Sequence, residues 1–179
     1  MRELSGLSNI VLIGFMGTGK TSIGRRVAQI LALNFVDSDA EIEAVMDMSV
    51  SDIFAKYGEV RFRSEENLII QKLSRLKRTV IATGGGAVLN PANLGALQAC
   101  GIVITLSASA EVIDQRTARK GSRPLLKNSL ASINEMMAMR EYAYRQGDYS
   151  IDTTALTVEE VVDELVQLLE EIGYDKGQG

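Results

Sequence analysis

The sequence predicts a three-layer α/β fold in a single domain, with a parallel sheet of about five strands and helices on both faces. Two observations predict it. Short runs rich in β-branched residues alternate with longer segments whose apolar residues recur at helical spacing. The length of 179 residues, 46% of them hydrophobic and 23% charged, suits one apolar core. Strands that alternate with helices favour βαβ units, in which consecutive strands are parallel.

The elements follow from this pattern in chain order. The first strand is expected at Asn9–Ile13, which ends at a glycine and precedes a helix with Ile23, Val27 and Ile30 on one face. Further strands are expected at Phe35–Val36, Thr79–Ala82, Ile102–Leu106 and Tyr149–Ile151. The main helices between and after them are expected at Glu59–Leu76 and Val158–Ile172.

One segment breaks the alternation. Lys120-Gly121-Ser122-Arg123-Pro124 combines turn-forming residues with cations, so we expect residues 117–128 to form a mobile lid instead of core. The whole chain, residues 1–179, is then one domain.

Composition excludes several classes of function. A net charge of −4 argues against nucleic acid or an anionic membrane as a partner. The chain has no run suited to a signal peptide or a membrane span, so we expect a cytoplasmic protein, with a monomer as the default. The absence of histidine excludes histidine bases and histidine metal ligands. Cys100 is the single cysteine, which excludes an intrachain disulfide.

A phosphate-binding loop is indicated by Gly14–Thr21, which matches the pattern G-x-x-x-x-G-K-[ST] between a predicted strand and a predicted helix. Its glycines allow backbone N–H groups to approach phosphate oxygens at the start of the helix. Lys20 adds a positive charge, and Thr21 offers a hydroxyl to Mg²⁺. The residues expected to bind ATP here are Gly14, Gly17, Thr18, Gly19, Lys20, Thr21 and Ser22. The fold is therefore expected to be a P-loop fold, a class that contains kinases, GTPases and motor ATPases.

Two carboxylates follow the second predicted strand. Asp37 and Asp39 come directly after it, at the edge of the sheet where open α/β folds bind ligands. Both are therefore expected to reach the same cleft. An alternative is helix capping, either by Asp39 itself or by a capping box of Ser38 and Glu41.

Two further segments allow both a structural and a functional interpretation. Arg63 has the helical spacing to pair with Glu59 or Glu66 on a solvated face, or it can bind an anion. Gly84, Gly85 and Gly86 follow the third predicted strand, where three glycines favour close approach of the backbone to a ligand over a simple turn.

Taken together, these segments resemble shikimate kinases in order and spacing, over nearly the whole chain from about Ile10 to Leu169. The matching series is the phosphate loop, Asp37-x-Asp39, Gly58-Glu59 with Phe62-Arg63 and Glu66, Gly84-Gly85-Gly86, Arg123-Pro124-Leu125-Leu126, and Arg140 before Tyr144. The resemblance implies transfer of the ATP γ-phosphate to the 3-hydroxyl of shikimate, giving shikimate 3-phosphate and ADP in aromatic amino-acid (chorismate) biosynthesis.

The resemblance also implies roles on the acceptor side, in a substrate-binding segment at about residues 34–63. Asp39 would bind the acceptor hydroxyls. Arg63, Arg140 and the Gly84–Gly86 segment would hold the carboxylate of shikimate. A planar guanidinium suits a carboxylate, and a carboxylate suits vicinal hydroxyls while it can also accept a proton.

On the nucleotide side, the resemblance implies that Thr21 ligates Mg²⁺ and that Asp37 supports the ion through water. Lys20, Asp39 and Arg123 would be catalytic, with Arg123 approaching the ATP phosphates from the lid. Many members have an adenine-contacting arginine or proline where this chain has Thr154–Val158, so no residue is assigned there. Arg116 is expected to flank adenine on the other side.

The residues also allow two alternatives to shikimate phosphorylation. The first is a kinase for another small hydroxy acid such as gluconate, since the phosphate loop and lid do not identify the acceptor. The second is a catalytically inactive nucleotide-binding homologue or a GTPase-like switch, although the sequence has no Asn-Lys-x-Asp guanine motif.

Overall fold

The computed structural model describes residues 7–118 and 129–174. Within them, one parallel sheet has five strands in the order β2-β3-β1-β4-β5. The strands are β1 (Asn9–Ile13), β2 (Asn34–Asp37), β3 (Thr79–Ala82), β4 (Gly101–Ser107) and β5 (Tyr149–Asp152). Each observed strand agrees with its expected bounds to within one residue at either end. The prediction of a parallel sheet of about five strands is confirmed.

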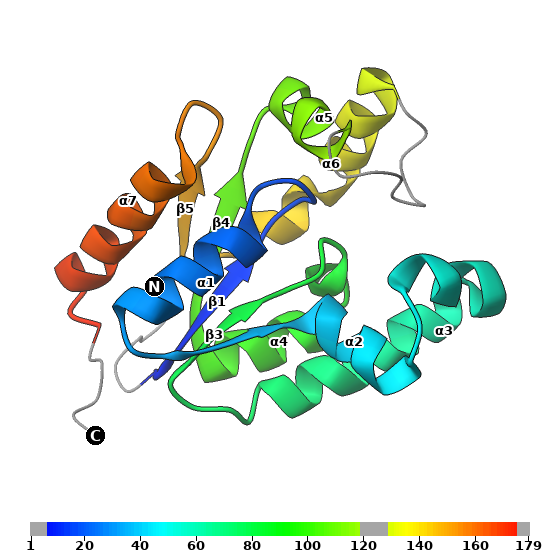
Figure 1. Ribbon diagram of the computed structural model, residues 1–179, viewed down its shortest axis with the longest axis horizontal. Coiled ribbons are helices and arrows are strands. Elements are labelled where there is room, and N and C mark those ends of the chain that lie inside the picture. Colours follow the sequence, from blue (N-terminus) through cyan, green and yellow to red (C-terminus); the bar gives the residue numbers. More distant parts are fainter. Residues whose placement is uncertain (1–6, 119–128, 175–179) are drawn as a thin grey trace.

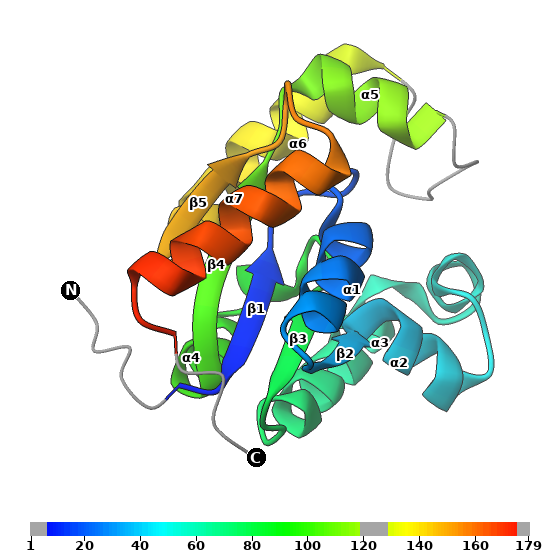
Figure 2. The ribbon, with the colours of Figure 1, turned by 60° about the vertical axis from the view of Figure 1, so that its left-hand side comes forward.

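Helices cover both faces of the sheet, which gives the three expected layers (Figures 1 and 2). On one face lie α1 (Lys20–Ile30) and α7 (Val158–Glu171), and on the other α3 (Val50–Leu73) and α4 (Pro91–Cys100). The remaining helices are α2 (Ser38–Met46), the short η1 (Ala87–Leu89), α5 (Ala110–Ala118) and α6 (Leu130–Tyr144).

The central strand β1 explains the two-sided core. Ile10 and Leu12 pack with α1 and α7, whereas Val11 and Ile13 pack with α3 and α4, because successive side chains of a strand point to opposite faces. All four side chains are fully buried. Burial of one such side chain stabilises a fold by about 1.5–3 kcal/mol, which is why a buried strand is apolar throughout.

Helix α3 differs from the helix expected at Glu59–Leu76. It starts earlier, at Val50, where the Ser49 hydroxyl accepts a hydrogen bond from the Asp52 backbone N–H. It is kinked at Gly58, whose φ of 78° lies in the left-handed region that favours glycine. It ends at Leu73, and the Leu76 carbonyl accepts a hydrogen bond from the Asn9 side chain at 2.7 Å, which directs the chain toward the sheet.

Because all the strands are parallel, the loops that follow them meet at one edge of the sheet. The phosphate loop follows β1, Asp37 ends β2, and the Gly84–Gly86 segment follows β3. Thr117 and Ala118, at the start of the expected lid, form the end of α5. The rest of the expected lid, including Arg123, lies outside the described residues. Throughout the described part of the chain, no helix is both long enough and apolar enough to span a membrane.

Candidate active site

The phosphate loop has the backbone geometry that its glycines predict. Gly14, Gly17 and Gly19 have φ values of 136°, 80° and 97°, all in the region that L-residues with side chains rarely adopt. A Cβ at Gly14 would collide with the Leu106 carbonyl oxygen on β4. The Thr18 hydroxyl donates a 2.8 Å hydrogen bond to the Phe15 carbonyl and closes the loop. Side chains at these glycines would therefore strain the loop or displace it from β4.

Lys20 begins α1 and turns back over the loop. Its ammonium group donates hydrogen bonds of 2.8 Å to the carbonyl oxygens of both Gly14 and Phe15. The side chain is thereby held beside the space that the loop encloses, where a phosphate anion would meet it.

Thr21 and Asp37 form a pair of oxygen groups beside the loop. The Thr21 hydroxyl donates a 2.7 Å hydrogen bond to Asp37 Oδ2. These are hard oxygen donors, and within the described residues no cluster of three or more Asp, Glu, His or Cys is placed to hold a metal. One hydroxyl and one carboxylate fit Mg²⁺, which keeps several waters and binds through one or two protein groups and substrate phosphates.

Asp37 also caps α2. Its Oδ1 accepts from the backbone N–H groups of Asp39 at 3.0 Å and Ala40 at 3.4 Å. The alternative that Asp39 or a Ser38 capping box caps this helix is therefore wrong. The Ser38 hydroxyl instead accepts a 2.8 Å hydrogen bond from the Gly84 N–H and ties β2 to the loop after β3.

A cleft of 400 Å³ lies next to the phosphate loop, between α2, α3 and α6. It contains every acceptor-side residue predicted from the sequence, together with several that were not predicted. Its walls include Met16, Thr21, Arg25, Asp37, Asp39, Glu43, Ser49, Val50, Ser51, Phe54, Phe62, Arg63, Glu66, Gly84, Gly85, Gly86 and Arg140.

Arg63 is both ion-paired and directed to this cleft. It contacts Glu66 at 2.8 Å and Glu59 at 3.2 Å, while 26% of its side chain stays exposed. The Glu66 side chain is only 1% exposed, and one of its oxygens has no hydrogen-bond partner within the described residues. The two interpretations of Arg63 are therefore compatible, because the ion pair orients the guanidinium at the wall of the cleft.

Burial and the ion pair shape the titration of this pair. Burial raises the pKa of Glu66, and the neighbouring Arg63 cation only partly opposes that change. Burial works to lower the pKa of Arg63, but Glu66 and then Glu59 outweigh it, so the pKa is raised. Arg63 thus keeps its charge in the cleft.

The three glycines after β3 bring side chains close to the backbone. A Cβ at Gly84 would collide with Asp39 Oδ1, and one at Gly86 would lie 2.5 Å from an Arg63 nitrogen. At Gly85 it would lie 3.2 Å from the Met16 backbone nitrogen. The glycines therefore let a carboxylate, a guanidinium and the phosphate loop converge around one short segment.

Arg140 reaches the same cleft from α6, with its guanidinium 5.7 Å from the centre of the Phe15 ring. Tyr144, one turn later, was not among the predicted site residues. Its hydroxyl donates a 2.6 Å hydrogen bond to the Gly85 carbonyl. A separate cavity of 620 Å³ between α6 and strands β4 and β5 has Phe15 and Tyr144 among its walls but contains no predicted site residue.

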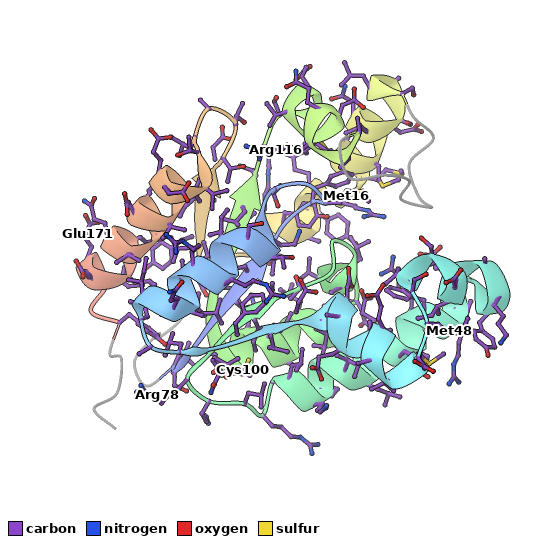
Figure 3. All side chains as sticks on the ribbon, in the orientation of Figure 1. Met16, Met48, Arg78, Cys100, Arg116 and Glu171 are labelled. Atoms are coloured by element: carbon purple, nitrogen blue, oxygen red, sulfur yellow. The ribbon has the colours of Figure 1, made fainter. Side chains whose placement is uncertain are left out.

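Arg116 lies on the opposite side of the phosphate loop from the cleft. Its position relative to the labelled Met16 can be followed in Figure 3. It donates to the Thr153 hydroxyl at 2.9 Å and the Thr153 carbonyl at 2.8 Å, and lines a 360 Å³ pocket with Leu156 and Val158. The apolar walls of this pocket, next to the phosphate loop, would suit the flat base of a nucleotide. Thr153, which the sequence did not indicate, fixes the arginine there.

A small space of 60 Å³ lies between the phosphate loop and the 400 Å³ cleft. Lys20 and Thr83 line it. Thr21, Asp37, Asp39 and Gly85 line both this space and the larger cleft. A phosphate held by the loop would therefore end where an acceptor in the cleft begins. Arg123 lies outside the described residues, so the structure does not place it.

Comparisons with known proteins agree with this geometry. The family model described as "Shikimate kinase" matches residues 16–170. The shikimate kinase of Desulforudis audaxviator is 47% identical over 169 residues, which cover 94% of this chain and 89% of that protein. A shikimate kinase structure from Acinetobacter baumannii, in complex with shikimate, has a TM-score of 0.89 and 36% identity, covering 95% and 97% of the two chains.

A weaker similarity concerns the gluconate alternative. A gluconokinase from Sinorhizobium meliloti has a TM-score of 0.59 and 17% identity, with 92% and 95% of the two chains covered. At this identity the likeness shows a common fold alone.

Proposed function

This chain belongs to the shikimate kinase family, and from that premise we propose that it transfers the γ-phosphate of ATP to the 3-hydroxyl of shikimate. The products are shikimate 3-phosphate and ADP. The observation that carries the proposal is the set of residues shared by the phosphate space and the cleft, chiefly Asp39 and Gly85. An in-line phosphoryl transfer needs this juxtaposition of donor and acceptor.

Each group has a proposed task that suits its position. Lys20 neutralises charge on the transferred phosphate, and Arg123 is expected to assist from the lid. Asp39 orients the acceptor hydroxyl and accepts its proton. Arg63 and Arg140 bind the carboxylate of shikimate, which takes no part in the chemistry. Thr21, and Asp37 through water, would hold Mg²⁺, which would supply positive charge against the phosphates.

One chain supplies the described residues that line both the cleft and the phosphate space. A monomeric enzyme stays our prediction.

An assay of ADP release with shikimate, gluconate or no acceptor tests this proposal. We expect ATP turnover that depends on shikimate and is much slower with gluconate. Turnover that prefers gluconate would support the other kinase, and turnover or nucleotide binding that ignores both acids would indicate a switch or an inactive homologue.

Thr21→Val is expected to raise the Mg²⁺ concentration needed for half-maximal turnover by about 10- to 100-fold, because it removes an oxygen donor next to Asp37. Titration of Mg²⁺ at saturating ATP measures this requirement. Thr21→Ser retains the hydroxyl and should behave nearly like the parent. An unchanged requirement in a folded Thr21→Val protein would argue against this metal position.

Arg63→Met is expected to raise the shikimate KM by about 10- to 150-fold and to leave ATP binding nearly unchanged, since a charge-assisted contact contributes about 1.5–3 kcal/mol. Arg63→Lys should recover part of the loss, because an ammonium lacks the planar fork. Arg61→Met is the matched control, because Arg61 pairs with Glu65 and is 54% exposed on the same helix. An unchanged shikimate KM in Arg63→Met would leave Arg63 as a structural partner of Glu66.

The same variant should also change the pH dependence of stability. Loss of Arg63 removes the cation that lowers the pKa of Glu66, so the pKa of this buried carboxyl rises further above its unfolded value. The native state then binds a proton more tightly than the unfolded state. Stability of Arg63→Met relative to the parent should fall as pH rises through that pKa, which urea unfolding at pH 5 and pH 8 can measure.

A further inference from the structure

Tyr144, the last residue of α6, joins separate parts of the molecule. Its hydroxyl donates a 2.6 Å hydrogen bond to the carbonyl of Gly85, which lies 59 residues earlier in the chain. Its own backbone carbonyl accepts a 2.7 Å hydrogen bond from the Thr105 hydroxyl on β4. The residue therefore links the helix that carries Arg140 to the loop after β3, with the sheet as an anchor.

The Gly85 peptide is confined on two sides. A Cβ at Gly85 would lie 3.2 Å from the Met16 nitrogen and 3.7 Å from the Gly14 carbonyl oxygen, so this residue packs closely against the phosphate loop. Tyr144 holds its carbonyl. Because a trans peptide is planar, a fixed Gly85 carbonyl also fixes the direction of the Gly86 N–H, which is opposite to it.

That N–H belongs to the expected carboxylate site. Gly85 and Gly86 line the cleft, and Gly86 lies against the Arg63 guanidinium. Within residues 7–118 and 129–174, neither glycine N–H donates a hydrogen bond to the protein. A carboxylate beside Arg63 could accept from them.

The surroundings of Tyr144 also connect it to both cations. Burial raises the pKa of Tyr144, while the nearby Arg140 and, to a lesser extent, Arg63 act in the opposite direction. The hydroxyl consequently stays protonated at neutral pH and keeps donating to Gly85. Arg140 lies one helical turn before it.

We propose that Tyr144 is a positioning residue for the carboxylate of the acceptor. Its hydroxyl fixes the Gly85–Gly86 peptide one helical turn from Arg140, so that N–H groups and guanidinium groups face the carboxylate in a fixed arrangement. The inference rests on the proposed function, because it requires an acceptor that carries a carboxylate.

Tyr144→Phe keeps the ring and removes the hydroxyl. We expect the shikimate KM to rise about 5- to 20-fold with kcat and the ATP KM nearly unchanged, because a buried carbonyl loses its donor and the carboxylate site loosens. The matched control is Tyr142→Phe, since Tyr142 is 62% exposed on the same helix. That control should behave like the parent in every measurement.

A second acceptor separates positioning from general loosening. The methyl ester of shikimate lacks the negative charge, so its weaker turnover should be affected little by Tyr144→Phe, and the preference for shikimate over the ester should shrink about 5-fold or more. Equal losses for both acceptors, or equal rises in the KM values for shikimate and ATP, would overturn the positioning role.

Thr105→Val covers the case in which Tyr144→Phe is less stable. This substitution removes the hydrogen bond from residue 105 to the Tyr144 backbone carbonyl but leaves the Tyr144 hydroxyl in place. It should therefore lower the melting temperature without raising the shikimate KM. An equal KM rise in Thr105→Val would make the effect structural and overturn the inference. Failure of the parent chain to phosphorylate shikimate would contradict the proposed function itself, whereas a normal parent with a normal Tyr144→Phe variant would contradict only the positioning role.

Discussion

Lys20→Met is expected to reduce kcat by about 10²- to 10³-fold or more, while the protein remains folded. The loss of one preorganised group that stabilises charge in a transition state commonly has an effect of this size. Methionine keeps most of the apolar stem of the largely buried lysine, so the start of α1 should remain packed. Lys20→Ala should show the same loss of turnover. Steady-state kinetics at saturating shikimate and Mg²⁺ measure the effect.

The control for this experiment is Arg26→Met. Arg26 is an exposed cation on the same helix, where its contact is a 3.3 Å hydrogen bond to Gln29. Its loss should change neither kcat nor either KM. A folded Lys20→Met enzyme with near-parental kcat would contradict the assignment of Lys20 to the phosphates.

Asp39→Asn is expected to reduce kcat by about 10²- to 10⁴-fold and to change ATP affinity little. The amide has the same shape, but it lacks the charge that orients the acceptor hydroxyl and accepts its proton. Because Asp37 and not Asp39 caps α2, the substitution should not remove a helix cap, and its effect on turnover can be assigned to the carboxylate. Calorimetry should therefore show nearly parental nucleotide binding in the variant, while its turnover with shikimate falls.

Glu41→Gln is the matched control for Asp39→Asn. Glu41 lies two residues further along α2 and pairs with Lys72 at 3.1 Å on the surface. Loss of such a pair changes stability by about 0–1 kcal/mol and should not alter turnover. Near-normal kcat in Asp39→Asn would show that the carboxylate is dispensable for proton transfer.

The features that the sequence predicted well are those that local chemistry determines. The glycines and Lys20 of the phosphate loop define a conformation by themselves, and the runs of β-branched residues place the strands to within one residue. Alternation of strands and helices then leads to a parallel sheet, whose carboxyl edge brings Asp39 and the Gly84–Gly86 segment together.

The features that it did not predict depend on contacts between distant segments. The spacing of Arg63 and Glu66 predicts an ion pair, but not that Glu66 is buried in the cleft wall. Thr153 holds Arg116 across 37 residues, and Tyr144 reaches Gly85 across 59. No local pattern encodes such partners, because they exist only once the helices have packed on the sheet.

The kink at Gly58 should make the backbone amides of the two segments of α3 exchange hydrogen at different rates. A left-handed residue interrupts the hydrogen-bonded ladder, so opening of the outer segment, Val50–Tyr57, need not propagate into the inner one. The inner segment packs Ile69, Ile70 and Leu73 into the core, and its amides should exchange slowly. Arg63 therefore stands on the inner segment, whereas Phe54, another residue that lines the cleft, stands on the outer one. We expect the two sets of cleft residues on α3 to differ in exchange rate although they belong to one continuous helix.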